Sequence, residues 1–187
     1  MSVPSLTGYY GKVPGRGDFI SRGLPRDFVA PWDRWLQQSL LLLEGHLGPV
    51  WPEWFASLAA VRFALNAGVC GSGAWIGVMV PSHDRVGRRF PLVLCRWMGK
   101  RRLDSSIFQQ QAAWYESVEK LAEECQAGIL EPEALPLNGD GPLGRRWFPQ
   151  VFRCLSWWWC PVEDRIVKVR GLPEAGVLIE WVERCRA

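Results

Sequence analysis

The sequence lacks any long uninterrupted hydrophobic run. Its apolar runs, such as Leu40 to Leu43, are far shorter than the roughly 20 residues that a membrane-spanning helix needs. The first ten residues, MSVPSLTGYY, also lack the basic and apolar regions of an export signal. We therefore expect a soluble cytoplasmic protein with no membrane insertion.

Histidine is scarce, and closely spaced cysteines are missing. The only histidines are His46 and His83, there is no CxxC motif, and the six cysteines are scattered at positions 70, 95, 125, 154, 160 and 185. A structural zinc site needs Cys and His ligands at short, regular spacings. A cytoplasmic chain that has its own core keeps such cysteines as buried thiols. We predict no metal site and no disulfide framework.

The motifs of nucleotide binding and of hydrolysis are absent as well. A phosphate-binding loop ending in Gly11-Lys12 requires glycine five residues earlier and Ser or Thr next, but Leu6 and Val13 occupy those positions. Neither a GxGxxG fingerprint after a predicted strand nor a G-x-S-x-G elbow occurs. These absences argue against a nucleotide cofactor and against an α/β-hydrolase.

What the chain does have is enough apolar sequence for one core: 187 residues, of which 48% are hydrophobic. We predict a single domain over residues 1–187. Residue patterns predict strands at 8–13, 59–66, 73–81, 90–97, 155–161 and 165–171, and helices starting at Pro31, Asp104 and Pro173. Gly45 and Gly128 are expected to end the first two helices, and residues 128–144 should form an exposed connection. The order predicts an α+β fold, a layered domain with a central, mainly antiparallel sheet flanked by helices.

Arginine is the dominant cation, with 18 arginines and 4 lysines. Seven bases and no acid lie between Arg85 and Arg102, which raises the hypothesis of nucleic-acid binding through this stretch. The net charge of +3 and the pI near 8.6 are below the values typical of nucleic-acid-binding domains, whose pI exceeds about 9. We therefore predict no nucleic-acid partner. The excess of arginine permits two-point recognition of carboxylate or phosphate, and the alternative explanation is a genome biased toward arginine codons.

The segment GKVPGRGDFISRGLPRDF, which starts at Gly11, places Asp18 among Lys12, Arg16, Arg22 and Arg26. In a loop bent by glycines, such a carboxylate binds arginine or caps backbone amides. We interpret Arg16 and Asp18 mainly as scaffold residues of a charged loop, with partner binding as the alternative.

A second polar segment, PSHDRVGRRFP, contains Ser82, His83 and Asp84 in a row. These residue types suggest a catalytic triad, but adjacent side chains on an extended turn point in different directions. The preferred reading is a turn in which Arg85 and Arg88 bind Asp84 or an acid on a partner. The alternative is a small hydrolase or nucleotide-binding enzyme that uses His83 and Asp84 with a remote nucleophile.

Three of the twelve tryptophans are consecutive at 157–159. In a strand they must place large rings on both faces. Either both faces of this strand are covered, or one ring, with Trp158 the candidate, is an exposed anchor for a partner.

Three blocks of the sequence resemble a known family. They read GYYGKVPGRGDFISRGLPRDFVAPWDRWL, RFALNAGVCGSGAWIGVMVPSHDRVGRRFPLVL and LSWWWCPVEDRIVKVRGLPE. They are similar to the signature blocks of the TagF family, also called ImpM, which is associated with the type VI secretion system. The third block departs from the family pattern at Cys160, Pro161 and Val162, where relatives commonly have T-x-G-S after the tryptophan pair.

The resemblance implies a regulatory role without catalytic residues. TagF-like proteins repress type VI secretion post-translationally through contact with the forkhead-associated protein Fha. Some relatives carry a fused PP2C-like phosphatase domain, which we do not expect in this chain. Forkhead-associated domains bind phosphothreonine, but the single threonine here, Thr7, lies in an N-terminal segment that we expect to be loose. We therefore expect Fha to bind a folded surface of this chain and not a phosphopeptide.

Overall fold

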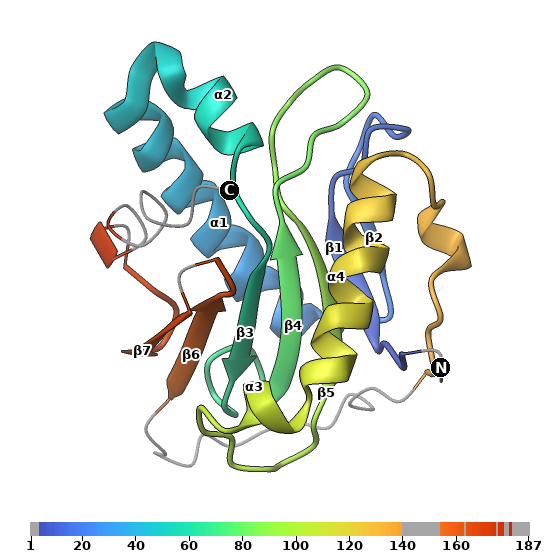
Figure 1. The fold of residues 1–187 in the computed structure, drawn as a ribbon, viewed down its shortest axis with the longest axis vertical. Helices are drawn as coiled ribbons and strands as arrows, with labels where there is room; N and C mark the ends of the chain where they lie inside the picture. Colours follow the sequence, from blue (N-terminus) through green and yellow to red (C-terminus); the bar gives the residue numbers. More distant parts are fainter. Residues whose placement is uncertain (1–3, 140–153, 163, 175, 178–179, 181–187) are drawn as a thin grey trace.

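The core of the protein is an antiparallel sheet covered by helices on both faces (Figure 1). The computed structural model describes residues 4–139, 154–162, 164–174, 176–177 and 180. Its strands are β1 (Gly8–Gly11), β2 (Ile20–Arg22), β3 (Val61–Leu65), β4 (Trp75–Val80), β5 (Leu92–Trp97), β6 (Leu155–Cys160) and β7 (Arg165–Arg170). Their order is β2-β1-β5-β4-β3-β6-β7, and all neighbouring strands are antiparallel.

The helices form the two outer layers. They are α1 (Arg26–Leu47), α2 (Trp51–Ala56), α3 (Ile107–Gln110) and α4 (Ala112–Gln126), with short 3-10 turns η1 (Gly48–Val50) and η2 (Pro132–Ala134). Figure 1 shows α1 behind the sheet and α4 in front of it. The predicted α+β class, with a mainly antiparallel sheet flanked by helices, is confirmed.

Alternation along the strands explains why both faces need a cover. In β3, Phe63 belongs to the cluster under α1 and α2, whereas the next residue, Ala64, belongs to the cluster under α3 and α4. In β6, Trp158 belongs to the cluster under α1 and α2, and Trp157 belongs to the cluster under α3 and α4. Because successive side chains of a strand point to opposite faces, two apolar neighbours require two helical layers.

Trp158 is part of this core. Its side chain is 1% exposed, its indole stacks on Trp32 of α1 at a centroid distance of 6.0 Å, and its Nε1 donates to Ser156 Oγ at 2.8 Å. The hypothesis of an exposed Trp158 anchor is therefore wrong, and the alternative, that both faces of β6 are covered, is confirmed.

Helix α1 begins earlier and ends later than predicted. Pro25 precedes its first residue, and Pro31 lies inside the helix. Pro31 has no backbone N–H and therefore removes one hydrogen bond from the helix. The helix continues through this position, with Phe28 and Trp32 packed against the sheet on either side of it. The helix passes through Gly45 and ends at Leu47, and the capping residue Gly48 follows with a positive φ of 54° that suits glycine.

Other boundaries also differ. All six predicted strands are present within two residues of their expected limits, but β2 and α2 were not predicted. The helix expected to begin at Asp104 is divided into α3 and α4, and Gly128 follows its end with φ 69° as expected. Within residues 128–139, Pro132 and Leu135 are buried, so this connection is not fully exposed. The helix predicted from Pro173 falls largely outside the described residues.

Candidate functional site

The two charged segments singled out from the sequence meet at one end of the sheet. Residues 12–19 connect β1 to β2, and residues 81–91 connect β4 to β5; we call them the first and second signature loops. Figure 1 shows both connections at the same end of the molecule. The backbone N–H of Arg85 donates to the carbonyl of Arg16 at 2.8 Å, and Arg88 Nη2 donates to the carbonyl of Gly17 at 2.6 Å. The order of the strands, with β1 beside β5, brings the loops together.

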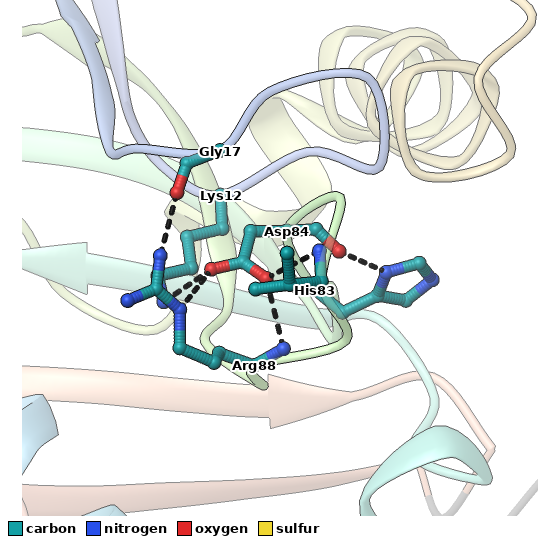
Figure 2. A network of polar contacts seen from close by, with 6 residues as sticks. Lys12, Gly17, His83, Asp84 and Arg88 are labelled. Carbon is teal, nitrogen blue, oxygen red and sulfur yellow. Dashed lines mark hydrogen bonds and ion pairs between the residues drawn. The ribbon is translucent and has the colours of Figure 1, made fainter.

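Asp84 is the centre of this contact (Figure 2). Its side chain is completely buried and accepts hydrogen bonds from four nitrogen atoms. Oδ2 accepts from Lys12 Nζ at 2.9 Å and from Arg88 Nε at 2.6 Å. Oδ1 accepts from the backbone N–H groups of Val86 at 3.1 Å and Arg88 at 2.9 Å. One carboxylate thus joins the first signature loop to the second.

The pairing keeps Asp84 ionised. Burial by itself raises the pKa of this carboxyl, but the hydrogen bonds from Lys12 and Arg88 outweigh it and hold the pKa well below its usual range. A carboxylate with this environment is a poor proton acceptor near neutral pH. Its contacts are those of a structural ion pair.

Lys12 extends the network toward α1. It is 6% exposed, and its Nζ lies 5.0 Å from the ring centroid of Phe19, a favourable cation–π position. Phe19 stacks on Tyr10, whose hydroxyl donates to Asp33 Oδ1 at 2.6 Å. Burial and this hydrogen bond raise the pKa of Tyr10. The signature loops are therefore fixed to the helical layer.

Of the two scaffold candidates in the first signature loop, Arg16 pairs with other residues of the chain, whereas Asp18 pairs with no described residue. Arg16 pairs with Glu131 at 3.5 Å and with Glu133 at 3.0 Å, both at the exposed surface, where such pairs contribute about 0 to 1 kcal/mol. Asp18 is exposed and has no hydrogen bond or ion pair with a described residue. The predicted scaffold role of Asp18, in which its carboxylate binds arginine or caps backbone amides, is wrong, and the carboxylate that holds Lys12 is that of Asp84.

Of the two arginines predicted to bind Asp84, only Arg88 does so. The Arg85 side chain is exposed and has no hydrogen-bond or ion-pair partner within the described part of the chain. It is therefore free to contact another molecule.

Ser82, His83 and Asp84 do not form a triad. Ser82 is 2% exposed, and its Oγ has no hydrogen-bond partner among the described residues. His83 Nδ1 lies 2.9 Å from the backbone carbonyl oxygen of Asp84, and Figure 2 shows the imidazole and the Asp84 carboxylate on opposite sides of the loop. The divergence predicted for these adjacent side chains is confirmed.

A hollow of about 250 Å³ lies beside the second signature loop. Ser82, His83 and Arg89 line it, together with Phe55 and Ala56 of α2. Its described lining contains no Asp, Glu or Cys, so no acid orients His83 from within the hollow. No three His, Cys, Asp or Glu side chains come together as a possible metal site in the described residues.

Strand β5 divides the basic stretch from Arg85 to Arg102. Arg85, Arg88 and Arg89 precede β5, whereas Lys100 to Arg102 follow it. A strand of six residues separates the two groups by about 20 Å. The seventh base, Arg96, lies within β5, and its Nη1 donates to Gln111 Oε1 at 3.3 Å.

Sequence reasoning missed a second buried ion pair. Arg62 on β3 is 5% exposed, and its Nε and Nη2 donate to the two carboxylate oxygens of Glu119 on α4 at 2.6 and 2.5 Å. The guanidinium also lies 4.6 Å from the Trp159 ring centroid. An arginine within the otherwise apolar strand VRFAL was the available signal. The pair lies between sheet and helix and serves the fold.

These features define a helix-covered antiparallel sheet with two interlocked charged loops at one end. Residues 8–136 match the family model of the TagF N-terminal domain, described as type VI secretion system-associated. The chain therefore belongs to the TagF family and has a role connected with type VI secretion.

A solved structure has a similar fold over nearly the whole chain. The chain is similar to PA0076 from Pseudomonas aeruginosa PAO1, with 29% identity, 94% of this chain and 93% of that chain covered, and a TM-score of 0.77. No curated protein matches the chain. No helix among the described residues is both long and apolar enough to cross a membrane.

Proposed function

We propose that this chain is a non-enzymatic cytoplasmic regulator that represses type VI secretion post-translationally by binding Fha. Membership of a type VI secretion-associated family supports a role in this secretion system. The observation that carries the binding role is the burial of Asp84. Because the only acid of the second signature loop is buried and paired, the formally charged side chains that the loop exposes are all arginines.

The same geometry favours binding over catalysis by His83 and Asp84. The four nitrogen donors around Asp84 occupy the carboxylate, and its backbone carbonyl faces the imidazole instead. A general base needs a free, oriented acceptor within hydrogen-bond reach of its proton. The hydrolase alternative has no such arrangement to support it.

Thr7 bears on how Fha would bind. The side chain is 2% exposed, and its Oγ1 accepts a hydrogen bond from the backbone N–H of Trp97 at 2.9 Å. The expectation of a loosely held Thr7 is therefore wrong. Since the single threonine of the chain is buried, phosphothreonine recognition would require local unfolding, and this supports recognition of a folded surface.

A secretion assay in cells that lack their own copy of the protein tests this function. The wild-type chain should restore repression, and His83→Ala should do so equally well, because no chemistry is assigned to His83. Arg85→Glu should fail to repress, while Arg101→Glu, a matched charge reversal at the opposite end of β5, should behave as wild type. Loss of repression in His83→Ala at normal protein levels would favour the enzymatic alternative.

A further inference from the structure

The tip of the second signature loop exposes an apolar side chain that the sequence reasoning did not select. Val86 is 68% exposed and follows Arg85 directly. Gly87 comes next with φ 86°, and a Cβ placed there would meet no atom within 4 Å. The tip therefore projects into open space (Figure 1).

The loop is held in one conformation before any partner arrives. Gly87 N donates to the carbonyl of Asp84 at 2.9 Å, Asp84 N to that of Arg88 at 3.1 Å, and Phe90 N to that of Ser82 at 3.0 Å. The carboxylate of Asp84 adds two bonds to backbone amides of the tip. A loop ordered in this way loses little conformational entropy when it binds.

Positive charge surrounds this apolar tip. Arg85, Arg88 and Arg89 are all exposed, and the Arg88 side chain keeps 61% of its surface in solvent despite its bond to Asp84. Asp18 is the one exposed acid in the two signature loops. Arginine presents a planar fork that matches carboxylates in two-point contacts.

We infer that the second signature loop docks by placing Val86 in an apolar depression ringed by Asp and Glu carboxylates on a folded partner. This inference rests on the proposed function, in which the partner is Fha, and it adds the contact residue and the chemistry of the opposing surface. Arg85 and Arg89 supply long-range attraction, and Val86 supplies the buried centre.

Calorimetric titration of purified Fha with the full-length chain separates the two contributions. Val86→Lys removes the apolar contact and adds a positive charge that an acidic partner surface attracts, whereas Val86→Asp removes the contact and adds repulsion. We expect Val86→Lys to weaken binding at least tenfold, or about 1.4 kcal/mol, and Val86→Asp to weaken it more. Leu41→Lys, at a position on α1 that is 71% exposed, is the matched control and should leave affinity unchanged.

Two further measurements complete the test: the salt dependence of the association rate, and binding to Fha that has been treated with phosphatase. Arg85→Gln should reduce the salt dependence of the association rate. Wild-type affinity in Val86→Lys would overturn this inference alone, because binding to Fha would remain. Absence of any binding by the wild-type chain would overturn the proposed function and this inference together. A complex that is lost when Fha is treated with phosphatase would place phosphate, not carboxylate, opposite the arginines and would overturn the stated chemistry.

Discussion

Replacing Asp84 by Asn removes one charge from the buried network with almost no change in shape. Lys12 then keeps a buried ammonium whose side chain is 8% exposed and has lost its anion. Arg88 loses the same partner, but its side chain is 61% exposed and remains solvated. Most of the cost therefore comes from Lys12, and breaking a buried pair in this way costs about 3 to 5 kcal/mol.

Urea unfolding followed by tryptophan fluorescence measures this loss. For a chain of this size the same change lowers Tm by about 6 to 20 °C. Asp18→Asn is the matched control, since this exposed carboxylate has no partner in the described residues; it should change stability by less than about 0.5 kcal/mol. The double variant Lys12→Met/Asp84→Asn should lose less than Asp84→Asn alone, because no buried charge is left unpaired.

The dependence of stability on pH provides an independent measurement of the pair between Lys12 and Asp84. The pKa of Asp84 is lower in the folded protein than the value of about 3.9 in an unfolded chain. Its stabilisation is therefore present above that value and is lost as the pH falls through it toward the folded pKa. The wild type should lose more stability than Asp84→Asn between about pH 5 and pH 2. Equal stability of Asp84→Asn and Asp18→Asn at pH 7 would refute the reasoning.

Two other predictions concern the core. Trp158→Ala should reduce the free energy of unfolding by about 3 to 5 kcal/mol in the same urea assay, and a loss below about 1 kcal/mol would show that the ring does not fill the space under α1. Cys70, Cys95 and Cys125 should react with an alkylating reagent only after unfolding, because they are buried and burial raises the pKa of each thiol, to about 11 for Cys125. Peptide mass spectrometry identifies the modified residues, and rapid labelling of Cys95 in the native protein would contradict this placement.

The strands were predictable because their signal is local. Alternating apolar and β-branched residues between Gly and Pro turns placed β3, β4 and β5 within two residues of their limits. The start of α1 was predicted too late because Pro31 was taken as the first residue of the helix. The sequence alone does not show that Phe28 and Trp32 both pack against the sheet, with Pro31 inside the helix between them. Short elements such as β2 carry too few residues for a periodic pattern.

The candidate site was predictable only in part, because its residues can be read from the sequence but the contacts between its two loops cannot. Both signature loops and most of their charged residues were visible in the sequence. The pairing of Lys12 with Asp84 was not, because 72 residues separate them and only the placement of β1 beside β5 brings them together. Asp18, six residues from Lys12, was the nearer carboxylate in sequence and was chosen in error. Exposure of Val86 depends on the same long-range contacts.

The most direct test of the central claim, that these loops form a recognition surface, is the affinity of purified Fha for three forms of the full-length chain. Wild type and Arg101→Glu should bind equally well. Arg85→Glu, which changes an exposed side chain without a partner in the described residues, should bind at least tenfold more weakly at unchanged Tm. Equal affinity of all three forms would contradict the claim and would place the Fha contact elsewhere on the molecule.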